Sequence, residues 1–306
     1  MIAGRRLIAA AGLVAVAAAL AACGSGSTSG ADSGRLDVVT TTTQLADFTR
    51  NVGGNRVAVR QLLKPNVDPH DYEPTPGDVA AVSSADVLVE HGIGLDTWLE
   101  PVVDNAGGDA LPVVATTGVP LLGGDSSEPD GDPHVWLDPR NAVTMVRNIE
   151  KGLAAADPDG AAAYRANADR YVARIEAFDR ELAARIDAVP AAKRKIVTDH
   201  DAFGYFAKRY GITVVGTVIP SLSTAAEPSA GDVTRLVSTI RREGVRVVFS
   251  ESSVDPRLQR AIAKESGATL GAPLYGDSLG PADQPAGTYL GMMRANMDAI
   301  VAGINS

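Results

Sequence analysis

The sequence predicts an α/β protein with two lobes, each containing a mainly parallel sheet covered by helices. Short β-type runs alternate with helical stretches from residue 36 to the C-terminal helix, which is the pattern of strand–helix–strand units. Between residues 159 and 188, apolar residues recur at steps of three and four, which predicts one helix of about 30 residues, roughly 45 Å long. A helix of this length is best explained as a connection between two lobes. The length of 306 residues also favours two domains.

The first lobe is expected to span residues 36–157. Thr75 and Pro76 mark one helix start, because threonine caps free backbone N–H groups and proline fits the first helical position. Gly53 and Gly54 mark a helix end. We expect strands at 36–41, 57–63, 85–90 and 111–115, and helices at 44–52, from 76, at 96–105 and at 140–155.

Residues 158–189 are expected to form the connecting helix, and residues 190–306 the second lobe. The second lobe repeats the alternation of the first, so a second parallel sheet is predicted. We expect its strands at 195–198, 213–218, 245–250 and 268–271, and its helices at 203–210, 230–242, 255–265 and 288–304.

The N-terminus has the features of an export signal over residues 1–22. Arg5 and Arg6 precede an apolar run that is too short for a membrane span. The run ends in Leu-Ala-Ala before Cys23, which resembles a bacterial lipobox. We therefore expect lipidation of Cys23, a flexible tether over residues 23–35, and a protein anchored on the extracytoplasmic face of the membrane. An ordinary signal peptide, and export by the twin-arginine route, stay open.

The charge and cysteine content exclude several classes of protein. The net charge is −9, and removal of residues 1–22 with their two arginines leaves 26 basic against 37 acidic residues. Nucleic-acid binding needs a basic surface, so it is not expected. Cys23 is the one cysteine, so the chain can form neither an internal disulfide nor a thiolate metal site in its folded body.

Three of the four histidines lie next to carboxylates. His70, His134 and His200 each have aspartates within a few residues, and such carboxylates can orient an imidazole that binds a metal. His70 and His134 occur in Asp-Pro-His, where proline stiffens the backbone before the histidine. His200 follows the predicted strand 195–198, and open α/β sheets bind ligands at the carboxyl ends of their strands. This pattern predicts a metal site. His91 lies before a glycine-rich turn and is interpreted as structural or as a support behind the ligands.

Five stretches occur in an order and spacing typical of one protein family: residues 68–76 (DPHDYEPTP), 92–99 (GIGLDTWL), 132–139 (DPHVWLDP), 198–211 around His200, and 275–280 (YGDSLG). Over residues 36–304 the chain resembles the zinc- and manganese-binding solute-binding proteins of bacterial ABC importers. The resemblance implies a metal site in the cleft between two lobes that one long helix joins and that hinge little. It also implies an ABC permease as the partner of a monomeric binding protein, and no catalysis.

Carried onto this chain, the family's ligands are His70 and His134 from the first lobe and His200 and Asp277 from the second. Three imidazoles and one carboxylate favour Zn²⁺, because Mn²⁺ prefers more oxygen donors; Mn²⁺ stays possible. Glu251, after the strand at 245–250, is expected near the site, with a surface or capping role left open. The acidic stretch 123–132 is interpreted as a solvated loop, or as a weak collector of cations.

Two other functions stay open at this point. A zinc hydrolase needs a coordination position free for water, which four protein ligands would fill. The chain also lacks the His-Glu-x-x-His and Gly-x-Ser-x-Gly patterns of hydrolases. A metal-binding adhesin lipoprotein is neither supported nor excluded by the residues.

Overall fold

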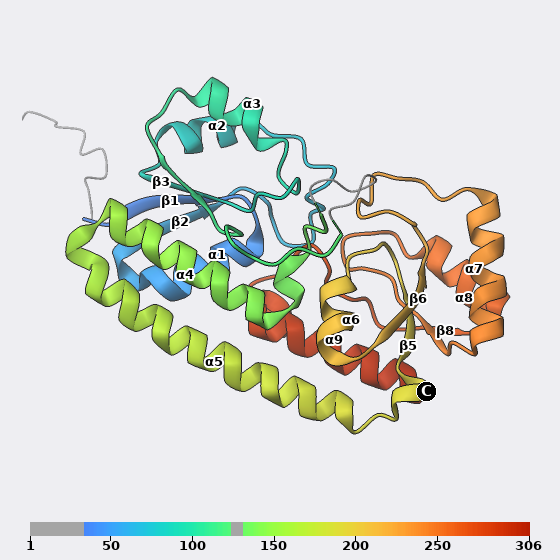
Figure 1. Ribbon diagram of the computed structural model, residues 1–306. Helices are drawn as coiled ribbons and strands as arrows, with labels where there is room; N and C mark the ends of the chain where they lie inside the picture. Colours follow the sequence, from blue (N-terminus) through green and yellow to red (C-terminus); the bar gives the residue numbers. More distant parts are fainter. Residues whose placement is uncertain (1–33, 124–130) are drawn as a thin grey trace, which may run out of the picture. The chain divides into compact units, whose positions relative to one another are not determined.

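The computed structural model describes residues 34–123 and 131–306 and contains two four-stranded parallel sheets (Figure 1). The first consists of β1 (Leu36–Thr40), β2 (Val57–Gln61), β3 (Val87–Glu90) and β4 (Leu111–Val114), in the order β2-β1-β3-β4. The second consists of β5 (Lys195–Thr198), β6 (Thr213–Thr217), β7 (Val247–Val248) and β8 (Thr269–Leu270), in the order β6-β5-β7-β8. The predicted α/β class with two parallel sheets is confirmed.

All helices except the last, α9, lie between successive strands, as parallel pairing requires. They are α1 (Thr43–Gly53), α2 (Pro76–Ser83), α3 (Leu99–Ala106), α4 (Pro139–Ala156), α5 (Ala161–Asp187), α6 (Gly204–Tyr210), α7 (Ala230–Glu243), α8 (Arg257–Ser266) and α9 (Tyr289–Asn305). Short 3₁₀ turns lie at Gly54–Arg56, Val135–Leu137, Pro158–Gly160, Ala191–Lys193 and Pro285–Gly287.

Each sheet is covered by helices on both faces. On the first sheet, α2 and α3 pack against one face through Val39 and Leu88, while α1 and α4 cover the other (Figure 1). On the second sheet, α7 and α8 cover one face, and Val197 and Val248 point into that layer. The other face of the second sheet contributes Ile196 to the same apolar core as α1, α4, α5 and α9. This core is therefore shared by both halves.

Helix α5 is a single helix of 27 residues that joins the two halves (Figure 1). It packs against α1 and α4 and also against α6 and α9. Its large apolar side chains, which include Tyr164, Ile175 and Leu182, are all buried. The predicted long connecting helix is confirmed.

Most predicted elements differ from the observed ones by one to three residues at an end, and two of these differences have a clear structural cause. The strand predicted at 245–250 is reduced to β7, because the backbone N–H of Val245 still bonds to Ile240 at the end of α7. Helix α3 begins at Leu99 rather than Asp96. The Asp96 carboxylate is buried in the preceding loop, where it accepts hydrogen bonds from the backbone of His91 and Gly92.

Several sequence predictions concern residues outside the described part of the chain. These are the signal peptide, Cys23, nearly all of the tether, and residues 124–130 of the acidic stretch. Asp132, at the end of that stretch, is described and is buried, so it is not part of a solvated loop. Among the described residues, no helix combines the length and apolarity that a membrane span needs.

Candidate metal centre

The predicted site residues lie in loops that follow the strands. His200 follows β5 and Glu251 follows β7, on the two sides of the point where the strand order of the second sheet reverses. His91 follows β3, and His70 lies in the long loop after β2. Parallel sheets place their ligands at such carboxyl edges, because the backbone leaves a crevice where neighbouring connections run in opposite directions.

The structure brings His70, His134, His200 and Asp277 together into one cluster, in which four candidate ligand atoms lie within 4.8 Å of one another. The Nε2 atoms of His134 and His200 are 3.2 Å apart. Asp277 Oδ1 lies 3.2 Å from His134 Nε2, and Asp277 Oδ2 lies 3.5 Å from His200 Nε2 and 3.9 Å from His70 Nε2. A tetrahedral zinc centre with Zn–N distances of 2.0–2.1 Å has ligand atoms about 3.3 Å apart, so the cluster has the dimensions of such a centre.

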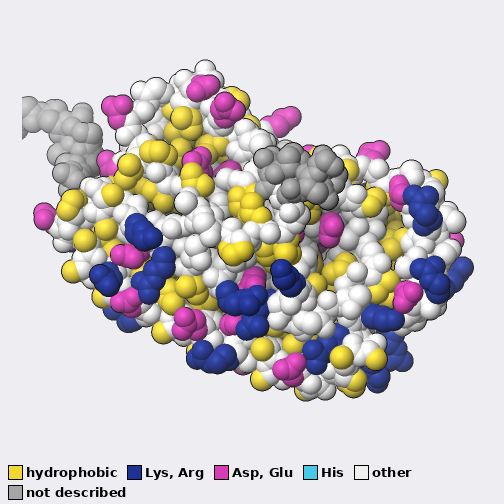
Figure 2. All heavy atoms as spheres, in the orientation of Figure 1, with side chains coloured by type: hydrophobic (Ala, Val, Ile, Leu, Met, Phe, Trp, Pro, Cys, Tyr) yellow, Lys and Arg dark blue, Asp and Glu magenta, His cyan; other side chains and the backbone are white. Residues whose placement is uncertain are grey.

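The cluster is buried, and three of its polar atoms lack hydrogen-bond partners in the described chain. His134, His200 and Asp277 are almost fully buried, and the His70 side chain is 8% exposed. His70 Nε2 and both carboxylate oxygens of Asp277 have no hydrogen-bond partner among the described residues. Unpaired buried polar atoms are costly, so their convergence indicates a group that the protein itself does not supply. On the face drawn in Figure 2, no histidine of the described chain reaches the surface.

Asp132 orients His134. The Oδ1 atom of Asp132 accepts from the backbone N–H of His134 and lies 2.8 Å from Nδ1 of its ring. The other ring nitrogen, Nε2, is therefore free to face Asp277. Burial opposes the charged form of His134, but the nearby carboxylates of Asp132 and Asp277 outweigh it and raise the pKa of the ring to about 9. A neighbouring carboxylate therefore supports this histidine, as the Asp-Pro-His pattern predicts.

His200 has a different partner from the one the sequence suggests. Its Nδ1 lies 2.6 Å from Oε1 of Glu251, and both side chains are buried. The aspartates on either side do not contact the ring: Asp199 accepts from Gln259, and the Asp201 side chain is exposed. Consecutive residues at a strand end point in different directions, so neither aspartate forms a hydrogen bond that orients the ring. The charge of Asp199, which lies within 4.8 Å of a ring nitrogen, still helps to raise the pKa of His200. Glu251 lies where it was expected, next to the cluster.

His70 and His91 occupy different kinds of position. Asp68 Oδ1 accepts from the backbone N–H of His70 and does not touch its ring. His91 is fully buried outside the cluster, where its Nε2 lies 2.8 Å from the carbonyl oxygen of Pro133. Burial lowers the pKa of His91 to about 4, so its ring is neutral and can donate to that carbonyl. His91 thus supports the backbone immediately before His134.

Asp277 is anchored by residues that the sequence did not indicate. The backbone oxygen of Gly276 accepts from the indole N–H of Trp136, and that of Asp277 accepts from the amide of Gln44. Both donors come from the first half of the chain, 140 and 233 residues away. Of these two donors, only Trp136 lies within one of the sequence stretches that pointed to the site, DPHVWLDP.

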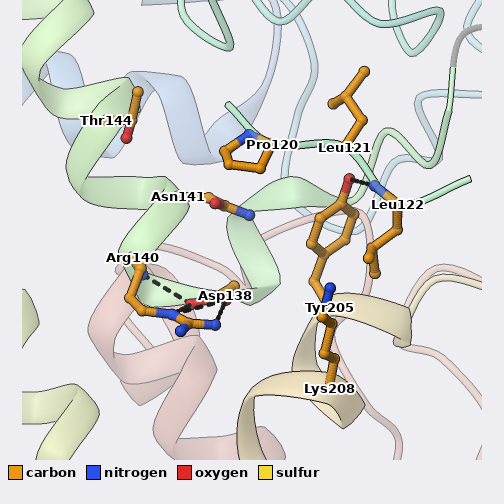
Figure 3. Close-up of a pocket in the computed structure, with 9 residues that line it drawn as sticks. All are labelled: Pro120, Leu121, Leu122, Asp138, Arg140, Asn141, Thr144, Tyr205 and Lys208. Carbon is orange, nitrogen blue, oxygen red and sulfur yellow. Dashed lines mark hydrogen bonds and ion pairs between the residues drawn. The ribbon is translucent and has the colours of Figure 1, made fainter. Parts of the chain in front are cut away.

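A separate hollow of about 440 Å³ lies between α4 and α6 (Figure 3). Its lining includes Arg140, whose guanidinium is paired with Asp138, and Tyr205. The Tyr205 hydroxyl accepts from the backbone N–H of Leu122 and donates to the backbone oxygen of Asp132. The described lining residues include no set of candidate metal ligands. Through its two hydrogen bonds, Tyr205 ties α6 to the segment that carries Asp132.

Comparison with known proteins identifies the family. Residues 38–303 match the model of the ZnuA family, described as zinc-uptake complex component A, periplasmic. The chain belongs to this family. It is 33% identical to the manganese-binding lipoprotein MntA of Halalkalibacterium halodurans over 297 residues, 96% of this chain and 97% of MntA. It is also 33% identical to the iron ABC transporter substrate-binding lipoprotein MtsA of Streptococcus pyogenes, over 93% of this chain and 94% of MtsA.

Among solved structures, the periplasmic zinc-binding protein TroA from Treponema pallidum matches with a TM-score of 0.83 and 32% identity, over 89% of this chain and 99% of TroA. The protein is therefore a metal-binding solute-binding protein of the kind that serves ABC importers, and not an enzyme. The relatives named here are described as binding or importing zinc, manganese or iron. Family membership therefore indicates a divalent metal as the ligand but does not distinguish among these metals.

Proposed function

We propose that the protein captures Zn²⁺ through His70, His134, His200 and Asp277 and delivers it to the permease of an ABC importer. The observation that carries this proposal is the convergence of four buried candidate ligands, with His70 Nε2 and both Asp277 oxygens unpaired in the described chain, at spacings close to those of a tetrahedral zinc centre. Three imidazole nitrogens and one carboxylate form a donor set that suits zinc. Four protein ligands also leave no coordination position for a reactive water, which suits a carrier of metal.

Manganese is the second candidate, and a specific feature of Asp277 favours it. Both of its oxygens face the cluster, one towards His134 and the other towards His200. A carboxylate that binds through both oxygens would give five donors, two of them oxygen, which brings the site closer to the preference of Mn²⁺.

The decisive experiment is a metal titration of protein purified without a histidine tag. We expect one Zn²⁺ per chain, tighter binding of Zn²⁺ than of Mn²⁺ in direct competition, and loss of tight binding in the H70A/H134A/H200A variant. Zinc at 1,000 times its Kd should stabilise the fold by roughly 4 kcal/mol, because the ion binds the native state. Nanomolar affinity in the triple variant would overturn the ligand assignment, and preferential binding of Mn²⁺ would overturn the choice of metal.

We further propose that Cys23 is lipidated and anchors the protein on the extracytoplasmic face of the membrane, as a monomer that meets its permease there. The Leu-Ala-Ala-Cys sequence supports this, as do the names of MntA and MtsA, which are called lipoproteins. In cells fed a labelled fatty acid, the wild type should carry the label in the membrane fraction, whereas C23A should not. Labelled C23A would contradict the assignment.

A further inference from the structure

Two of the four proposed ligands are histidines whose rings are held from behind by buried carboxylates. Asp132 accepts from the ring of His134 and Glu251 from the ring of His200, at 2.8 and 2.6 Å. These contacts fix the orientation of each ring, because one nitrogen is engaged and the other must face the metal. Neither ring can swing away without breaking a buried hydrogen bond to a charged group.

The third ligand, Asp277, is fixed through its backbone. The carbonyl groups of Gly276 and Asp277 accept hydrogen bonds from Trp136 and Gln44, at 3.0 and 2.9 Å. Leu279, two residues later, donates its backbone N–H to the hydroxyl of Thr43 at 2.8 Å. The segment that carries the carboxylate is therefore attached at three points to the first half of the molecule.

His70 differs from the other three ligands. Within the described chain, no hydrogen bond reaches its ring, and it is the only one of the four that is not fully buried. It also lies in a long loop between β2 and α2 without regular secondary structure. When a metal leaves a site with several ligands, the ligand with the least support is the easiest to displace, and here that ligand is His70.

Two side chains from the second half contact the loop that carries His70, and one of them acts on the backbone of His70 itself. Asp68 accepts from the backbone N–H of His70 through Oδ1 at 2.9 Å, and through Oδ2 it accepts from the hydroxyl of Thr224 at 2.6 Å. Thr224 lies in the loop between β6 and α7, 156 residues away. A second contact joins the backbone N–H of Asn66 to the hydroxyl of Ser278 at 2.7 Å. Asp68 thus couples the opposite half directly to the backbone of His70.

We propose that Thr224 is a positioning residue that holds His70 over the metal through Asp68, and that this contact sets how fast the bound metal leaves. The proposal rests on the proposed metal-binding function and concerns the rate of exchange at that site. Both partners are partly buried, so water competes for the contact less than at an open surface. Breaking this contact would loosen His70, although its loop keeps the contact between Asn66 and Ser278, and would leave the other three ligands in place.

The test measures zinc loss into excess chelator by stopped flow, in the full mature chain. T224V removes the hydroxyl, and dissociation should become roughly tenfold faster, because a hydrogen bond to a carboxylate is among the stronger ones. T224S keeps the hydroxyl and should restore the wild-type rate. T234V is the matched control: Thr234 lies on α7, and its hydroxyl bonds to Ala230 of the same helix.

A double-mutant cycle separates positioning from a general loss of stability. In the D68A background, T224V should cause no further acceleration, because Thr224 acts through Asp68. A wild-type rate for T224V, additive effects of T224V and D68A, or equal acceleration by T234V would each overturn the proposal. If the wild type binds no stoichiometric zinc or manganese, the proposed function itself fails, and that outcome is distinguishable from all of these.

Discussion

The contact between Glu251 and His200 allows a sharp prediction about metal affinity. Replacing Glu251 by glutamine keeps the size of the side chain and an oxygen that can accept from Nδ1, but removes the negative charge. Size matters here, because a Cβ atom on Gly276 would lie 2.2 Å from Oε2 of Glu251, so the space around the carboxylate is full. E251Q therefore tests the charge behind the ligand with little change in packing.

The expected magnitude follows from the geometry. The hydrogen bond is 2.6 Å long and both partners are buried, so solvent screens it little. Carboxylates that support metal-binding histidines typically contribute 10- to 100-fold to metal affinity. We therefore expect the Kd for Zn²⁺ to rise about 10- to 100-fold in E251Q, equivalent to roughly 1.4–2.8 kcal/mol.

The assay is a competition titration against a chelating dye, with D199N as the control. Asp199 is also fully buried and lies next to His200 in the sequence, but its hydrogen bond goes to Gln259 rather than to the ring. D199N should change the affinity much less than E251Q. Wild-type affinity in E251Q, or an equal loss in D199N, would refute the reasoning that Glu251 acts through its contact with the imidazole.

Three further predictions follow from the same site. Carboxylate partners raise the pKa of His134 to about 9 and that of His200 to about 10 against the effect of burial, so in the metal-free protein both rings hold protons at neutral pH. Zn²⁺ must displace these protons, so its Kd should rise as pH falls, by up to about 100-fold per pH unit between pH 8 and 6. A Kd that does not change with pH would show that the rings are already neutral. H200E should shift the preference of the site from Zn²⁺ towards Mn²⁺, because it replaces a nitrogen donor by oxygen donors. The shift should be clearer when H200E is combined with E251Q, because the new carboxylate and that of Glu251 would otherwise repel each other. Unchanged selectivity in competition titrations would contradict this. G276A should lower the Tm and weaken zinc binding about tenfold, because the new methyl group displaces Glu251; wild-type melting and affinity would contradict this.

Local sequence patterns predicted most of the fold because each pattern depends on near neighbours. The capping residues at Thr75 and Pro76 and the apolar spacing in α5 are properties of a few turns of chain, and the structure agrees with them. Strand β7 is shorter than the predicted strand 245–250, because the β-type run extends on both sides of the two residues that form the strand. Pairing depends on the neighbouring strand, which the run itself does not encode.

The candidate site divides in the same way. The sequence stretches around His70 and His134 pointed to a metal because the histidine and the rigid proline are adjacent. The Glu251–His200 contact spans 51 residues, the Thr224–Asp68 contact 156, and the Gln44–Asp277 contact 233. Such pairs are created by the topology, which places separate strand ends side by side, so no local pattern could assign them.

The position of α9 has a consequence for how the chain reaches its native state. Tyr289, the first residue of α9, packs edge-on against Phe48 of α1 with ring centroids 4.9 Å apart, and its backbone N–H donates to Asp47, 242 residues earlier. Helix α1 therefore has no complete core until the last helix has been synthesised. Closing so long a loop is slow, and the nascent chain remains without its final packing while it emerges. The first helix is thus completed by the last, so the core of the first half closes only when the whole chain is available.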